Sequence, residues 1–188
     1  MAMAGGHVDT LRVPDREARL RPLGPRGEGW IGIQMLLEVG CLVVSVLTGP
    51  VISGPARVAA AAVGLVLLAG GALLFGWGAS HLGATFSVWV TPRSTGRLVT
   101  SGPYRFSRHP VCTAQVLICA GWSLAAASAV GLLIVPLVAW YLDHYKLARE
   151  EQTLLARYPG YGAYMAAVPH RMLPAAPRAV PAEGRGAG

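Results

Sequence analysis

Charged residues are scarce in this sequence. Asp, Glu, Lys and Arg make up 13% of its 188 residues, and 53% are hydrophobic. A soluble domain carries roughly a quarter charged residues. The length allows one domain, and the apolar excess excludes an ordinary water-soluble one. Lipid is the expected solvent.

Cysteine is scarce as well. The three cysteines, Cys41, Cys112 and Cys119, are odd in number, lie in or beside apolar runs and form no C-x-x-C pair. This pattern excludes a disulfide framework and a zinc site of the usual spacing. The histidines and carboxylates also lack metal-ligand spacing, so no metal ion is expected.

Basic residues outnumber acidic ones, giving a net charge of +7. They fall as five in residues 1–28, one at Arg57, four from 93 to 108 and six from 146 onward, with apolar runs between. The positive-inside rule for membrane proteins produces such alternation. No basic run is interleaved with aromatic residues, so nucleic acid is not an expected partner.

The apolar runs predict an all-α, multi-spanning bundle of about four membrane segments. The first two are residues 30–47 and 58–75, the second with Gly64, Gly70 and Gly71 suited to close helix packing. Residues 111–142 contain no charge and are too long for one crossing, so we expect a helical hairpin that reverses at 125–128. Pro136 is expected to kink its second helix.

Four domains follow from this pattern. We expect a flexible cytoplasmic arm (1–28), two membrane helices (29–79), a catalytic region that includes the hairpin (80–174) and a disordered tail (175–188). Residues 86–99 could form a small β-hairpin, and 143–157 a charged helix that continues past the lipid. Four crossings place all basic clusters except Arg57 on one side of the membrane, together with both termini. The positive-inside rule predicts that this side is cytoplasmic. The composition suggests a bacterial inner membrane.

Two polar groups stand out on that side. Arg108 and His109 precede Pro110, a residue suited to the first turn of a helix. Glu150 and Glu151 lie on the charged helix. Taken separately, Arg108 and His109 could be interface anchors, and Glu150 could form a solvated i,i+4 pair with Lys146. Glu38, four residues after Gln34 on one helical face, is expected to pair within the bundle.

The order of the motifs narrows these alternatives. Five motifs follow one another along the chain. They are L-G-A-T-F-S (82–87), L-V-T-S-G-P-Y-R-F-S-R-H-P-V-C (98–112), R-E-E-Q-T-L-L (149–155), Y-G-A-Y (161–164) and R-M-L-P (171–174). The ordered set resembles the isoprenylcysteine carboxyl methyltransferase and phospholipid methyltransferase family over residues 80–174. Residues 29–79 match only in hydropathy.

The resemblance implies a cytoplasmic pocket for S-adenosylmethionine and a substrate tunnel that opens to lipid. The residues it implies for binding the cofactor are Tyr104, His109, Pro110, Arg149, Glu150, Tyr161 and Tyr164. Those it implies for catalysis are Arg108, Glu151 and Arg171. The sequence departs from the family pattern where Cys112 replaces a Tyr, Ala114 a Gly and Pro159-Gly160 an F-G pair, which weakens any inference about the substrate.

Methyl transfer to a lipophilic acceptor is therefore the predicted activity. The acceptor is expected to be the carboxylate of a prenylcysteine-like or small lipid or terpenoid substrate, which needs no general base; an amine or hydroxyl would need His109 or a glutamate as proton acceptor. An NADPH-dependent membrane reductase of sterol-reductase type is the alternative, with Arg149 and Arg157 as candidates for binding the 2′-phosphate. A non-catalytic helical scaffold is the third possibility.

Overall fold

The computed structural model describes residues 28–83 and 98–172, and within these ranges the secondary structure is entirely helical. The helices are α1 (Glu28–Leu47), α2 (Gly54–Leu82), the 3-10 helix η3 (Gly102–Arg105), α3 (Pro110–Ala125), α4 (Ala129–Tyr141), the π-helical segment η4 (Leu142–Leu147), α5 (Ala148–Arg157) and α6 (Tyr161–Ala167). The all-α prediction is confirmed.

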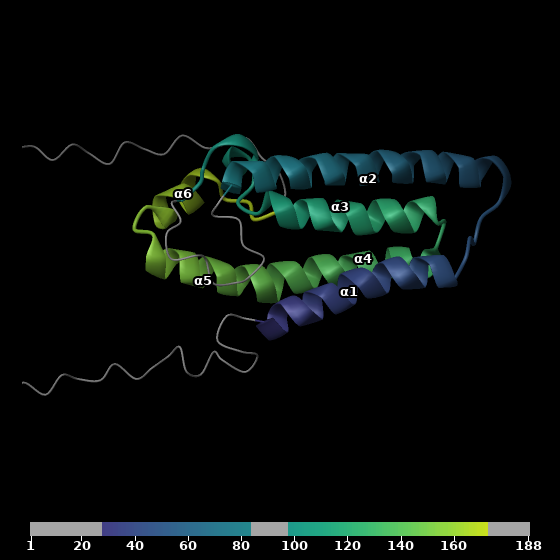
Figure 1. Cartoon of the computed structure of the whole chain (residues 1–188), viewed down its shortest axis with the longest axis horizontal. Helices are drawn as coiled ribbons and strands as arrows, with labels where there is room; N and C mark the ends of the chain where they lie inside the picture. Colours follow the sequence, from purple (N-terminus) through teal and green to yellow (C-terminus); the bar gives the residue numbers. More distant parts are fainter. Residues whose placement is uncertain (1–27, 84–97, 173–188) are drawn as a thin grey trace, which may run out of the picture.

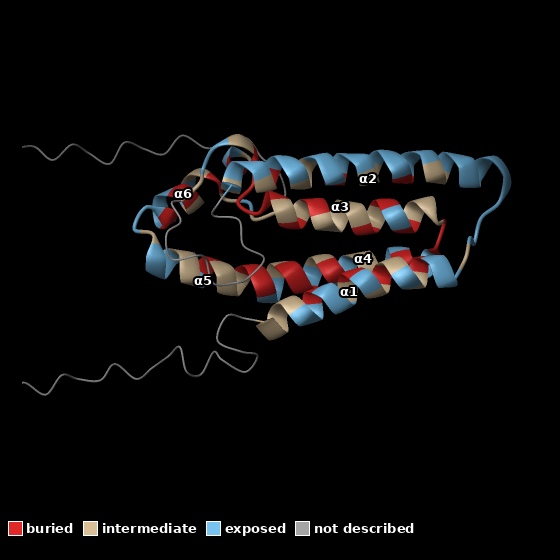
Figure 2. Ribbon diagram, in the orientation of Figure 1, coloured by how far each residue is buried: buried red, intermediate tan, exposed pale blue. Residues whose placement is uncertain are grey.

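The long helices have the length and composition of membrane spans. α1, α2 and the continuous helix Ala129–Arg157 are each long and apolar enough to cross a bilayer, and α3 is a shorter apolar helix. Large apolar side chains lie on the outside, among them Leu47, Leu73 and Leu133, each at least three-quarters exposed. Figure 2 shows the outer face of α2 exposed almost from end to end. An apolar surface of this extent is suited to lipid.

The helices pack as two pairs that lie side by side (Figure 1). α2 packs along α3, α1 along α4, and the α3–α4 hairpin joins the pairs. The start of α1, the end of α2, the start of α3, and α5 and α6 lie at one end of the bundle. The motifs that flank α3 and the charged helix therefore share an end, as predicted, whereas Arg57 lies in the first turn of α2 at the other.

Glycine allows the close approach of α2 to α3. A Cβ atom on Gly64 would lie 2.5 Å from the backbone nitrogen of Ala125, and one on Gly121 would lie 2.6 Å from that of Leu68. Gly71 faces α3 one heptad further along. The sequence correctly predicted Gly64 and Gly71 in this interface, but Gly70 was wrong, since no heavy atom lies within 4 Å of its Cβ position.

The α3–α4 turn lies where the sequence predicted a reversal. Ala127 adopts φ 53°, in the left-handed region, and the Ser128 hydroxyl caps α4 by accepting from the Gly131 N–H at 3.0 Å. The buried Ser45 hydroxyl lies 2.9 Å from that of Ser123 and ties α1 to the hairpin. Hydrogen bonds of this kind hold membrane helices together where apolar contact alone gives little preference.

One prediction about the connecting segments is wrong, and others concern residues outside the described ranges. Leu98–Thr100 does not form the predicted strand, because it is irregular in the structure. The predicted strand partner at 86–90 and the tail (175–188) lie outside the described residues, as does the arm (1–28) apart from Glu28, which begins α1.

Candidate functional site

The mouth of α3 meets α5 through two charged side chains. Arg108 and His109 precede Pro110, which begins α3 as predicted. The Arg108 Nε lies 2.8 Å from Oε1 of Glu151 on α5, and both side chains are almost fully buried. His109 Nε2 lies 3.3 Å from the same oxygen. The two groups that the sequence placed at one end of the bundle are thus in direct contact.

A second guanidinium binds the other oxygen of this carboxylate. Arg171 Nε lies 2.9 Å from Glu151 Oε2, and its NH1 lies 3.6 Å from Asp143 Oδ1. Burial disfavours the charge on Arg171, but the Glu151 carboxylate outweighs this and raises the pKa of the guanidinium. Arg171 is one-third exposed, so it can still contact a ligand.

The chain holds Arg171 in place through its backbone. The His109 N–H donates to the Arg171 carbonyl at 2.8 Å, and the Ser107 hydroxyl donates to the same carbonyl at 2.7 Å. Arg108 NH1 donates to the Val168 carbonyl at 2.7 Å. Arg171 is therefore bound to the R-H-P segment, and Arg108 and Val168 are in contact although they are 60 residues apart in sequence.

Glu150 adds a more accessible carboxylate beside this cluster. Its side chain is 26% exposed, with Oε1 3.9 Å from His109 Nδ1 and Oε2 3.8 Å from Lys146 Nζ. The predicted i,i+4 pair of Lys146 and Glu150 is therefore confirmed. The expected solvated setting is wrong, because Lys146 is only 8% exposed.

The three predicted tyrosines lie next to the cluster. The Tyr164 hydroxyl donates to the Tyr104 carbonyl at 2.6 Å, and the Tyr104 hydroxyl to the Gly78 carbonyl at 3.4 Å. Within the described residues the buried Tyr161 hydroxyl has no hydrogen-bond partner. Burial raises the pKa of Tyr161, an effect to which the nearby Glu151 adds. Its phenol is therefore a neutral donor at physiological pH.

Arg149 lies apart from these side chains. Its guanidinium lies over the Trp30 ring of α1, 6.0 Å from the ring centroid. The structure thus brings together Tyr104, Arg108, His109, Pro110, Glu150, Glu151, Tyr161, Tyr164 and Arg171 at one end of the bundle. The roles of these nine residues and of Arg149 in catalysis or in binding the cofactor stay predictions.

A family model described as phospholipid methyltransferase matches residues 59–160. This chain belongs to the phospholipid methyltransferase family. The match covers more than half of the chain and includes Arg108, His109, Glu150 and Glu151. α1 and the residues after 160, Arg171 among them, lie outside the matched segment. Membership implies an enzyme that transfers methyl groups to lipid-type substrates, in a protein with helices suited to a membrane.

No curated protein matches the chain. No solved structure matches it either.

The predicted pairing of Glu38 within the bundle is confirmed, since Gln34 Nε2 donates to Glu38 Oε1 at 3.0 Å, but sequence reasoning missed the cavity beside this pair. Gln34, Glu38, Gln115 and Lys146 line a cavity of about 330 Å³ between α1, α2, α3 and η4. The available signal was the i,i+4 pair of polar residues in an apolar segment, because ionisable groups at membrane depth usually face a cavity or a partner.

Proposed function

We propose that the protein transfers a methyl group from S-adenosylmethionine to a lipophilic acceptor. The observation that carries the proposal is the contact between the mouth of α3 and α5, in which Glu151 joins Arg108 and Arg171. Membership of a methyltransferase family supports the reaction class. We further propose an integral membrane location, with both termini and this site on the cytoplasmic side of a bacterial inner membrane.

The chemistry of the available groups fits the cofactor. S-adenosylmethionine carries a carboxylate, an ammonium group, ribose hydroxyls, an adenine and a sulfonium. The partly exposed Glu150 can accept hydrogen bonds from the ammonium group or the ribose, and the partly exposed Arg171 can bind the carboxylate. The unpaired Tyr161 hydroxyl offers a donor whose burial without a partner costs about 1–3 kcal/mol.

Glu151 acts in this account as a positioning residue. Its Oε1 accepts from Arg108 and lies near His109, and its Oε2 accepts from Arg171. Because both oxygens have cationic partners, Glu151 is poorly suited to take a proton from a substrate. It holds three side chains in one geometry instead, and pre-organisation of this kind favours in-line reaction.

Burial of the cluster also favours the proposed chemistry. The cofactor, when bound, supplies a methyl group on a cationic sulfur, and transfer to an anionic or neutral acceptor disperses or removes that charge at sulfur. Arg108, His109 and Glu151 are all at least nine-tenths buried and limit the access of water. The sequence predicts an acceptor with a carboxylate head group, and the alternative is an amine or a hydroxyl. The side chains of the cavity that binds the acceptor decide between them.

A reductase that uses NADPH finds less support. A 2′-phosphate needs a cluster of basic side chains, and the candidates Arg149 and Arg157 lie over the rings of Trp30 and Tyr158 respectively. Among the described residues neither guanidinium forms an ion pair with the Glu151 cluster.

A thermal-shift assay on the purified protein distinguishes these functions. S-adenosylhomocysteine is expected to raise the unfolding midpoint in a concentration-dependent way, whereas NADPH is expected to have no effect. The response to S-adenosylhomocysteine should be weakened in His109→Ala. A response to NADPH alone would support the reductase, and a response to neither would support the non-catalytic scaffold.

A further inference from the structure

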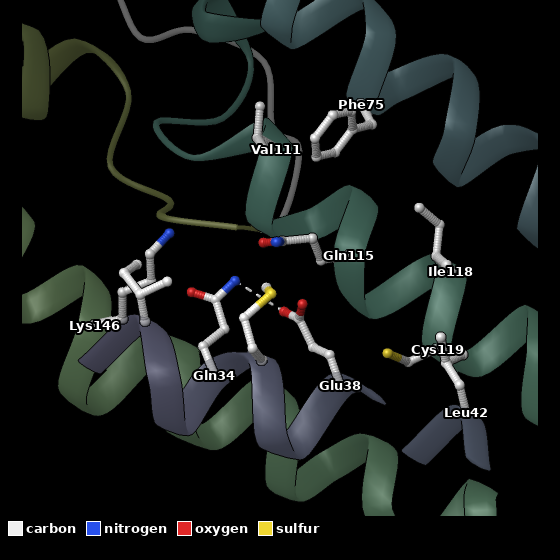
Figure 3. Close-up of a pocket in the computed structure, with 11 residues that line it drawn as sticks. Gln34, Glu38, Leu42, Phe75, Val111, Gln115, Ile118, Cys119 and Lys146 are labelled. Carbon is white, nitrogen blue, oxygen red and sulfur yellow. Dashed lines mark hydrogen bonds between the residues drawn. The ribbon is translucent and has the colours of Figure 1, made fainter. Parts of the chain in front are cut away.

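The cavity between α1, α2, α3 and η4 combines an apolar wall with a small polar patch. Ile31, Met35, Leu42 and Phe75 are among its apolar lining residues. Gln34 and Glu38 project into it from α1, opposite Gln115 of α3, and Lys146 lies at its edge (Figure 3). At about 330 Å³ it is at the small end of ligand-binding pockets. Met35 lines the cavity and is 43% exposed on the outside of the bundle, so the cavity borders the lipid-facing surface.

Two buried hydrogen-bond acceptors of the polar patch have no partner among the described residues. Gln34 Nε2 donates to Glu38 Oε1 at 3.0 Å, and Gln34 Oε1 is buried with no donor among the described residues. Gln115 Oε1 is also buried and has no partner in the part of the chain that the structure describes. Gln34 is 3% exposed and Glu38 is 9% exposed. Unpaired buried acceptors of this kind indicate a ligand that donates hydrogen bonds.

The two charges that border the cavity differ in how they are balanced. Lys146 Nζ lies 3.8 Å from Glu150 Oε2 and donates to Cys112 Sγ at 3.4 Å, so an acidic partner balances its charge. Glu38 has an amide as its hydrogen-bond partner and no cation within ion-pair distance among the described residues. An ionisable residue at membrane depth without a direct ion-pair partner is a candidate for ligand binding.

We propose that this cavity binds the head group of the methyl acceptor, and that Glu38 selects a lipophilic amine or alcohol over a carboxylate. The proposal rests on the proposed methyltransferase function and names its substrate class. Glu38 accepts the N–H or O–H of the head group, the two amide oxygens accept further hydrogen bonds, and the chain extends past Met35 into lipid. A carboxylate head group would instead face a like charge and two acceptors.

The position of Lys146 connects this cavity to the cofactor site proposed above. Lys146 lines the cavity, and its ammonium group is within 4 Å of Glu150, which in turn lies 3.9 Å from His109. Lys146 therefore borders both the cavity and the Glu150 carboxylate. α1, which supplies Gln34 and Glu38, lies outside the segment that matches the family.

The test measures binding without any turnover. Purified protein in phosphatidylcholine nanodiscs is titrated with lauryl amine, lauryl alcohol and laurate, which share a chain and differ in head group. We expect the amine and the alcohol to bind with higher affinity than laurate. Glu38→Gln keeps the side-chain shape and should weaken amine binding about tenfold, an amount typical of one hydrogen bond to a charged group. Glu28→Gln makes the same change at the start of α1, outside the cavity, and should leave amine binding unaltered.

Parallel titrations with S-adenosylhomocysteine separate the two proposals. We expect wild type and Glu38→Gln to bind it equally, which also shows that the variant is folded. Equal amine affinity in wild type and Glu38→Gln, or tighter binding of laurate than of amine by wild type, would overturn the role of Glu38. If S-adenosylhomocysteine does not bind wild type, the proposed function fails, whereas the selectivity of the cavity is still decided by the three lauryl ligands.

Discussion

Arg108 and Glu151 are 43 residues apart in sequence and form a buried ion pair with an N–O distance of 2.8 Å. The pair joins the mouth of α3 to α5, and Arg171 extends it to the segment after α6. Removal of one partner of a buried pair leaves an uncompensated charge, so these residues have structural as well as functional importance.

Glu151→Ala is expected to lower the free energy of unfolding by about 3–5 kcal/mol, because it leaves two guanidiniums without their shared carboxylate. Thermal unfolding in detergent would measure the loss. Glu150→Ala is the matched control: its carboxylate is 26% exposed with ion-pair distances of 3.8 and 3.9 Å, so a smaller loss than for Glu151→Ala is expected, although the buried Lys146 loses its acidic partner. Equal destabilisation by both substitutions would contradict the central position of Glu151.

Gly64→Ala should separate α2 from α3, since its Cβ would lie 2.5 Å from the Ala125 nitrogen and 2.6 Å from the Gly121 carbonyl oxygen. Both neighbours are backbone atoms that cannot rotate away, and a loss of about 1–3 kcal/mol is expected. Gly70→Ala, on the same helix with open space around it, should be neutral or slightly stabilising. Thermal unfolding midpoints of the two variants test this prediction. An unchanged midpoint for Gly64→Ala would contradict the close packing of α2 against α3.

Tyr161→Phe and Tyr164→Phe remove the same hydroxyl from neighbouring positions in α6. The Tyr161 hydroxyl has no partner among the described residues, so its loss should make the apo protein at least as stable as wild type but weaken S-adenosylhomocysteine binding about five- to tenfold. The Tyr164 hydroxyl donates to the Tyr104 carbonyl, so its loss should cost about 1 kcal/mol of stability. Calorimetric titration and thermal unfolding of both variants test this. The reverse order of the two effects would rule out a ligand contact by Tyr161.

Thiol labelling should report the folded state. Cys41, Cys112 and Cys119 are at most 3% exposed, so a maleimide should react slowly with the native protein and modify all three thiols after unfolding. Mass spectrometry counts the labels under both conditions. Rapid modification of Cys112 in the native protein would contradict its packing against Val138 and Leu142.

Much of the site could be predicted because its parts follow directly from local sequence. Pro110 fixed the start of α3, and the number of apolar runs placed this start and Glu151 at the same end of the bundle. The i,i+4 spacing also predicted the pair of Lys146 and Glu150.

The burial of Lys146 could not be predicted in the same way. A regular α-helical period puts Asp143 and Glu151 on adjacent faces of one helix, but the π-helical segment Leu142–Leu147 changes that period. In the structure Arg171 contacts both carboxylates. The cavity lined by Glu38 could not be predicted either, because it depends on how α1 packs against α2, α3 and η4, and side-chain spacing within one helix does not specify that packing.

The most direct test of the account is methyl transfer itself. Purified protein is incubated with methyl-labelled S-adenosylmethionine and a membrane lipid extract, and the labelled product is identified by its mass. The account predicts label in a lipid whose mass has increased by one methylene, and a loss of at least about a hundredfold in rate for His109→Ala combined with Arg171→Ala. Absence of labelled lipid from a preparation that binds S-adenosylhomocysteine, or full activity in the double variant, would contradict it.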